Sequence, residues 1–498
     1  MTCPRKRDGG RVRPSFATAA AAAIIVSLLA SCAGAPKPQS AQGAQAEQPK
    51  TQSAKPAEPK APELTAEQKR VQGVETAAAL LDQGEASQAA DKLGELAAAT
   101  PDDPGLKLIQ VAALLSAGKE DEARKKVDEL LALQPGNAEA LAMGAKIAQL
   151  TGDDNGRRSY LDRGLASAPG NAAVLSAWGD YYLDSKAWPK AEEFYQKAVA
   201  ADPKSADAAL GLGRALYREA KYPDAEIALD KAIELEPASA LAYSDRSRVL
   251  YKEGKYKESE ADLDSAISKA PGSSWLYIDR GRYRLDTGES EGALADFDKA
   301  ISLDPDYFLT YAYRGGLLEV SGKDKEALDD YRKIIKLYPD YWYAFESAGA
   351  AAFRLGLWDE ASADFKRALG FAPDRYEYAI AAGLAQWRSG DAKGASAFAA
   401  SVAAPIDRDK YGIYWSMLRL MQDQNDSSSD LEVRIQSEKK LDLKAGMLFY
   451  LSEYWICRDR ADLAEKYLSY AEDMKRQDTL EYRLLKAERA RLEPGSDG

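Results

Sequence analysis

Nine prolines stand at a constant spacing of 34 residues along most of this chain. They are Pro101, Pro135, Pro169, Pro203, Pro237, Pro271, Pro305, Pro339 and Pro373. A period between about 20 and 50 residues indicates a structural unit that stacks on its own copies, because one unit alone cannot bury its apolar face. The 498 residues are therefore predicted to form a repeat array rather than three ordinary domains.

Small and aromatic residues recur at fixed positions within each 34-residue unit. With the spaced proline at position 32, the unit that begins at Ala172 has glycine at position 8, tyrosine at 11 and 24, and alanine at 20 and 27. Small residues let two helices approach closely, and aromatic side chains fill the remaining gap. Proline at position 32 ends the second helix. Glycine at position 15 is predicted to end the first helix with a positive φ angle in eight units, at Gly84, Gly118, Gly152, Gly254, Gly288, Gly322, Gly356 and Gly390.

This pattern resembles the tetratricopeptide repeat. The resemblance implies an all-α fold, a right-handed superhelix (α-solenoid) of about ten to eleven helix-turn-helix repeats. We expect the array to span residues 67–407 and a C-terminal helical region to span 408–498. That region should contain an aromatic helix from Tyr411 to Met421, a polar loop, and a degenerate repeat from Ala445 that caps the array.

The N-terminus has the layout of an export signal. Residues 1–31 join a basic start to an apolar run that ends in Leu29-Ala30-Ser31-Cys32. This ending resembles the lipobox of bacterial lipoproteins. The resemblance implies removal of residues 1–31, acyl chains on Cys32 that anchor the protein in a membrane, and an outer-membrane address because Ala33 follows. The alternative is an ordinary signal peptide cut between Ala30 and Ala35.

Residues 32–66 are rich in Ala, Pro, Gln and Lys and contain little that can be buried. Such a segment cannot offset the entropy lost on ordering, so it is predicted to be a disordered linker between the anchor and the array. The alternative is a segment that binds the cell wall.

Composition excludes several classes of function. The net charge is −12 and histidine is absent. An acidic chain is a poor ligand for nucleic acid, and without histidine most zinc sites and imidazole-based catalysis are removed. The three cysteines show no metal-ligand spacing. We therefore predict no metal, no cofactor and no enzymatic activity, and we expect Cys457 to be a buried, unreactive thiol.

Charged residues replace the usual apolar residue at position 7 in three successive units. Arg246, Arg280 and Arg314 stand there, and the same three units have Asp262, Asp296 and Asp330 at position 23 of the second helix. The two preceding units have neither residue. Because positions 7 and 23 face each other across the helical hairpin and a buried charge needs a partner, an Arg–Asp pair within each repeat is predicted. A ligand site is the alternative.

In tetratricopeptide arrays the first helix of each repeat lines a concave groove, chiefly through positions 2, 5, 9, 12 and 13. The resemblance implies that an extended acidic or aromatic peptide binds there. Tyr217 and Tyr251 could instead pack between repeats while the arginines pair with Asp245 and Asp279. The candidate groove residues are Arg214, Tyr217, Arg218, Arg248, Tyr251, Lys252, Trp275, Arg282, Tyr343, Phe353, Arg354 and Trp387.

The lysine at position 5 and asparagine at position 9 that clamp a peptide carboxylate in one variant of the family are replaced here, for example by Leu210 and Arg214. Together the patterns predict a lipid-anchored scaffold of the cell envelope that binds partner proteins or peptides. A surface-exposed lipoprotein adhesin, using the convex face to bind host components, is the alternative. The sequence leaves open the partner, the oligomeric state and the side of the membrane.

Overall fold

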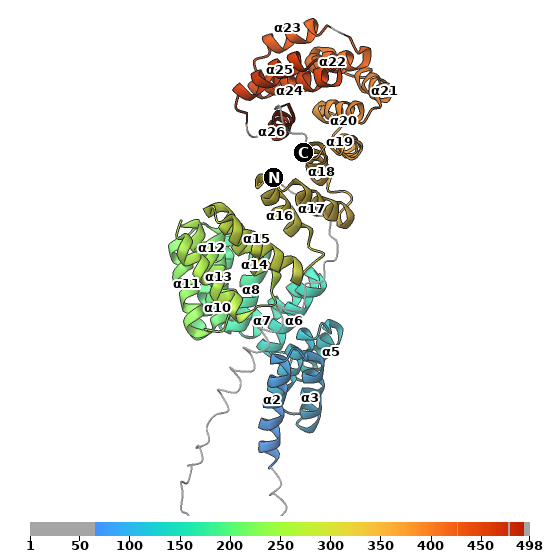
Figure 1. Ribbon diagram of the computed structural model, residues 1–498. Coiled ribbons are helices and arrows are strands. Elements are labelled where there is room, and N and C mark those ends of the chain that lie inside the picture. Colours follow the sequence, from blue (N-terminus) through green and yellow to red (C-terminus); the bar gives the residue numbers. More distant parts are fainter. Residues whose placement is uncertain (1–64, 426, 477–478, 493–498) are drawn as a thin grey trace, which may run out of the picture. The chain divides into compact units, whose positions relative to one another are not determined.

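The computed structural model describes residues 65–425, 427–476 and 479–492, and every regular element within these ranges is an α-helix (Figure 1). The chain divides into two compact units, unit 1 up to Pro271 and unit 2 from Gly272. This boundary falls inside the predicted array, and the C-terminal region belongs to unit 2. The predicted leader, Cys32 and nearly all of the linker lie outside the described residues.

Unit 1 consists of consecutive helical hairpins, and we call the two helices of each hairpin A and B. Each B helix contacts the A helix of its own hairpin, and every B helix before the last one of the unit also contacts the A helix of the next hairpin, as in a solenoid. The A helices are α2 (Ala66–Asp82), α4 (Pro104–Ser116), α6 (Ala138–Thr151), α8 (Ala172–Asp184), α10 (Ala206–Arg218) and α12 (Ala240–Lys252). The B helices are α3 (Ala86–Ala99), α5 (Glu120–Leu133), α7 (Asp154–Ser167), α9 (Trp188–Ala201), α11 (Tyr222–Leu235) and α13 (Tyr256–Lys269).

Unit 2 continues the same pattern and adds five helices. Its A helices are α14 (Ser274–Thr287), α16 (Phe308–Val320), α18 (Trp342–Arg354) and α20 (Tyr376–Arg388). Its B helices are α15 (Ser290–Leu303), α17 (Asp324–Leu337), α19 (Trp358–Phe371) and α21 (Ala392–Ala403). The additional helices are α22 (Arg408–Asp423), α23 (Ser429–Ser437), α24 (Leu441–Cys457), α25 (Ala461–Asp473) and α26 (Leu480–Leu492).

The predicted register is confirmed, including in the early repeats, whose sequences match the pattern less well. All eight glycines at position 15 have positive φ angles, between 68° and 100°. Where the repeat lacks this glycine, Lys186 and Ala220 adopt the same left-handed conformation, with φ of 58° and 59°. Asp459, at position 15 of the degenerate repeat, does so too. The packing of the hairpin therefore imposes this backbone conformation even on residues that favour it poorly.

The predicted close packing within hairpins is also present. A Cβ atom added to Gly179, at position 8, would lie 2.8 Å from the ring of Tyr195, at position 24. Ala191 and Ala198 are both buried, and Ala191 belongs to the same small core cluster as Tyr195. Pro189 lies in the first turn of α9, where its missing N–H group costs nothing.

The three predicted Arg–Asp pairs are confirmed. Each arginine is on an A helix and forms at least two hydrogen bonds with the aspartate of its own B helix, for example Arg246 with Asp262 at 2.8 and 2.6 Å. The next repeat has no arginine at position 7, and there Asp364 accepts instead from Arg332 of the preceding B helix, at 2.7 Å. A buried carboxylate at position 23 thus has a guanidinium partner in all four repeats.

The C-terminal region agrees with the prediction in two elements and departs from it in one. Helix α22 contains the predicted aromatic helix, and α24 with α25 forms the degenerate repeat, whose Trp455, Ala464 and Ala471 are buried. Helix α23 was not predicted, because its first turn lies within the polar loop. Cys457 is a half-buried free thiol at the end of α24, and burial raises its pKa.

Candidate partner-binding faces

The A helices of unit 1 line the inner side of the array. Helix α6 contacts α8, α8 contacts α10, and α10 contacts α12, whereas the described B helices show no comparable contacts with one another. Helices that approach each other more closely lie on the side of smaller radius. We call the surface formed by positions 2, 5, 9, 12 and 13 of the A helices the inner face. The predicted groove residues occupy these positions.

Two of the predicted arginines in unit 1 share one carboxylate. Asp245 of α12 accepts a hydrogen bond from Arg214 of α10 at 2.5 Å and from Arg248 of α12 at 3.0 Å. Burial opposes the charge of Arg214, but Asp245 and other nearby anions outweigh it and raise the pKa of the guanidinium. The arginines therefore do pair with Asp245, as the alternative interpretation held.

The other four predicted residues of unit 1 lie at positions 12 and 13. The rings of Tyr217 and Tyr251 pack on Tyr222 and Tyr256 of their own repeats, with centroids 5.9 and 5.3 Å apart. Arg218 and Lys252 are exposed. The guanidinium of Arg218 lies 5.9 Å from the ring centroid of Trp188. In these two repeats the second half of the inner face is basic.

Two acidic residues on the same face were missed. Asp180, at position 9 of α8, accepts a hydrogen bond from the hydroxyl of Tyr195 at 2.6 Å. Asp207, at position 2 of α10, is open to solvent, but surrounding protein atoms and the charge of Asp180 raise the pKa of its carboxyl. Their repeat positions alone could have identified them. The inner face therefore changes from acidic on α8 to basic at the ends of α10 and α12.

Three predicted residues of unit 2 remain at least partly exposed. Arg282 lies 3.4 Å from Asp279 and 5.5 Å from the ring centroid of Tyr313. Tyr343 is 45% exposed and stacks on Trp342 at 3.7 Å. Trp275 is half-buried at the start of α14. Trp275 and Arg282 both lie on α14, whereas Tyr343 lies on α18, two repeats further along the array.

The expectation that Phe353, Arg354 and Trp387 line an open groove is not met. Phe353 is 1% exposed and Trp387 is 9% exposed, packed against Phe449 and Tyr454 of α24 respectively. Arg354 has a side chain only 7% exposed, held by Glu319 at 3.1 Å and Asp324 at 2.8 Å. The physical reason is that α24 and α26 pack onto the inner face of unit 2.

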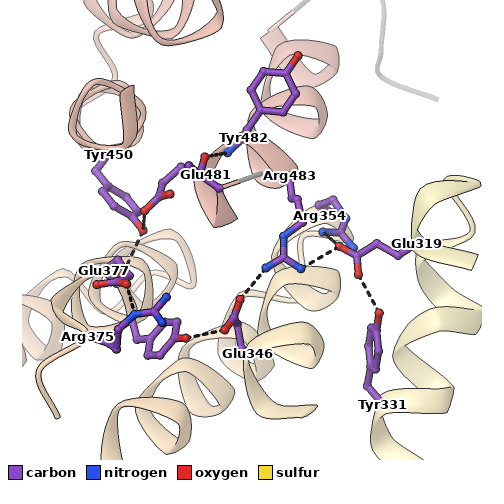
Figure 2. A network of polar contacts seen from close by, with 12 residues as sticks. Glu319, Tyr331, Glu346, Arg354, Arg375, Glu377, Tyr450, Glu481, Tyr482 and Arg483 are labelled. Carbon is purple, nitrogen blue, oxygen red and sulfur yellow. Dashed lines mark hydrogen bonds and ion pairs between the residues drawn. The ribbon is translucent and has the colours of Figure 1, made fainter. Parts of the chain in front are cut away.

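Helix α26 is joined to the inner face of unit 2 by a network of polar contacts (Figure 2). Arg483 of α26 reaches Glu346 of α18 at 2.7 Å and Glu319 of α16 at 3.4 Å. Tyr450 of α24 donates a hydrogen bond to Glu481 of α26 at 2.8 Å. The network lies on positions 2, 5, 12 and 13 of the A helices, the positions predicted for a bound partner.

A pocket of about 460 Å³ between α23, α24 and α25 is lined by residues of both charges, including Glu432 and Lys466, and contains none of the predicted site residues. In the described ranges, acidic and cysteine side chains form no cluster that could hold a metal ion. None of the described helices is both long and apolar enough to span a bilayer.

Comparison with known families agrees with this architecture. A tetratricopeptide-repeat family model matches residues 75–138 and 278–341, and the model of the cilia and flagella-associated protein 70 middle TPR-like domain matches residues 145–269. The array is built of tetratricopeptide repeats. Both matching models describe repeat domains rather than enzymes. No curated protein matches the chain significantly.

Solved tetratricopeptide structures resemble parts of this array. YrrB, described as a TPR protein with an unusual peptide-binding site, is 22% identical, with 37% of this chain and 95% of YrrB covered and a TM-score of 0.33. A tetratricopeptide-repeat protein from Parabacteroides merdae is 21% identical, with 50% and 99% covered and a TM-score of 0.36. PilF of Pseudomonas aeruginosa is 17% identical, with 44% and 94% covered and a TM-score of 0.36.

Proposed function

We propose that this protein is a lipid-anchored scaffold of the cell envelope that binds an extended acidic segment of a partner protein on the inner face of unit 1. The observation that carries the proposal is the basic end of that face. Positions 9 and 13 of α10 and α12 hold Arg214, Arg218, Arg248 and Lys252. Asp245 accepts hydrogen bonds from the two arginines at position 9. Rigid stacked helices hold these groups in place, so a partner meets little ordering cost on this side.

Charge reversal at the exposed positions tests this site. The double variant Arg218→Glu, Lys252→Glu should lose a partner that copurifies with the wild-type protein from envelope extracts, because the face becomes acidic. Both residues are exposed, so the fold should be unaffected. Lys257→Glu, on the exposed side of α13, is the matched control and should retain the partner. Retention by the double variant would refute this binding face.

The anchor and the address are tested separately. Mass spectrometry of the mature N-terminus should find Cys32 acylated, and Cys32→Ser should remain uncleaved. An unmodified N-terminus between Ala30 and Ala35 would refute the anchor and leave the binding face untouched. Protease treatment of intact cells separates a periplasmic scaffold, which is protected, from a surface adhesin, which is digested.

A further inference from the structure

The pocket between α23, α24 and α25 has an apolar interior. Ile435 of α23, Leu448 of α24 and Tyr467 of α25 line it and are buried, so each of the three helices contributes an apolar side chain. Its volume of about 460 Å³ lies near the lower end of the range of about 300–1,000 Å³ that small-molecule sites occupy in proteins. The pocket is therefore large enough for a small organic ligand.

The pocket is open to solvent along α25. Tyr470 and Met474 stand one turn apart on this helix and both line the pocket. The side chain of Tyr470 is 51% exposed, and Met474 is half-buried. Apolar surface in contact with water is unfavourable, so an apolar group that entered the pocket would be stabilised by covering it.

One cation in the lining has only a neutral partner. Lys444 of α24 is half-buried, and its ammonium group donates to the backbone carbonyl oxygen of Gln436 at 3.3 Å. Lys444 forms no ion pair with any residue that the structure describes. A charged group that is partly removed from water is normally matched by an opposite charge. An anion entering the pocket would supply that charge.

The other charged groups of the lining leave this position open. Glu432 accepts a hydrogen bond from Ser428, and burial together with a hydrogen bond to Glu432 raises the pKa of the Tyr467 hydroxyl. The ammonium of Lys466 lies 4.8 Å from the ring centroid of Tyr467, and Asp473 is exposed. The carboxylate of Glu432 is thus already engaged by hydroxyl groups, and neither it nor Asp473 forms an ion pair with Lys444.

We propose that this pocket binds a single-chain amphiphile, a molecule with one apolar chain and an anionic head group. The head group lies beside the ammonium of Lys444, and the chain lies on Ile435, Leu448 and Met474. One chain of about ten carbons suits a pocket of this size better than a lipid with two chains. The site uses none of the residues of the unit 1 face, so either proposal can fail without the other.

The test measures binding of four ten-carbon probes to the full chain by isothermal titration calorimetry, below the concentrations at which they form micelles. Decanoate and decyl phosphate carry an anionic head, decanol a neutral one and decylammonium a cationic one. At least one anion should bind with a stoichiometry of one and at least tenfold more tightly than decylammonium. The tighter of the two anions shows whether the natural head group is a carboxylate or a phosphate. Decylammonium binding as tightly as both anions, or no saturable binding of either anion, would overturn the proposal.

Variants of the lining locate the binding in this pocket. Lys444→Gln removes the charge at similar length and should weaken binding of the anions about tenfold while leaving decanol unchanged. Lys439→Gln, at an exposed position that does not line the pocket, is the matched control and should bind like the wild type. Met474→Trp should fill the pocket and abolish binding without changing the urea midpoint.

Three outcomes of the variant experiments would overturn the proposal. The first is wild-type affinity for the anions in Lys444→Gln, and the second is wild-type affinity in a folded Met474→Trp chain. The third is a wild-type chain that sediments as a dimer and becomes monomeric in Tyr470→Lys, since a second copy would then occupy the pocket.

Discussion

The Arg246–Asp262 pair of unit 1 offers a quantitative test of how charge is accommodated inside a hairpin. The side chain of Asp262 is 7% exposed and accepts two hydrogen bonds from Arg246. The side chain of Arg246 is 23% exposed and also forms an ion pair with Asp230, which is exposed. Removing one member of a buried ion pair costs about 3–5 kcal/mol, because the other charge loses its partner. The cost is lower where the remaining charge reaches water.

These exposures give different magnitudes for the two single variants. Arg246→Leu strands the buried Asp262 and should destabilise unit 1 by about 3 kcal/mol. Asp262→Ala leaves Arg246 its contact with Asp230 and access to solvent, so it should cost about 2 kcal/mol. The preceding repeat already places Leu212 and Ala228 at these two positions, with Ala228 buried against apolar neighbours. The double variant copies that arrangement and should cost about 2 kcal/mol or less.

The predicted quantity is therefore the coupling between the two changes. The two single costs sum to about 5 kcal/mol, so the double variant should show a coupling of about 3 kcal/mol. Urea denaturation followed by circular dichroism measures the three free energies, and hydrogen exchange in α12 and α13 shows that the effect lies in unit 1. A double variant that loses about 5 kcal/mol, the sum of the single costs, would refute the reasoning, because the pair would then contribute no mutual interaction.

Three further predictions follow from the backbone and the buried groups. Ala220→Gly should stabilise unit 1 by about 1 kcal/mol in urea denaturation, because alanine is strained at φ 59°, and Gly254→Ala should cost about the same; equal effects of one sign would contradict this. Burial raises the pKa of the Glu453 carboxyl, and Arg388 offsets only part of this rise. As the pH falls, the carboxyl therefore takes up a proton at a higher pH in the folded protein than in the unfolded chain. The stabilisation that comes from this proton uptake is lost as the pH rises through the folded pKa. The melting temperature of Glu453→Gln should therefore exceed that of the wild type by more at pH 7.5 than at pH 5. The same difference at both pH values would contradict this prediction. Cys457 should react with a disulfide reagent about a hundredfold more slowly in the folded protein than in denaturant, and equal rates would contradict its burial.

Much of this architecture could be predicted because it depends on contacts that are short in sequence. Position 15 takes a left-handed conformation at Gly254 and also at Ala220. Arg246 and Asp262 are 16 residues apart and belong to one hairpin. The repeat period places such residues opposite each other in every unit, so a pattern along the chain translates directly into a contact.

The state of the candidate binding faces was decided by tertiary structure. Arg483 meets Glu319 across 164 residues, and Glu488 meets Arg388 across 100 residues, in contacts that no repeat period encodes. The sequence by itself determined that Phe353 and Trp387 occupy a repeat position that faces the inner side. Only the folding of α24 and α26 onto that side decided that these residues are buried, because burial depends on what packs against a face and not on the face alone.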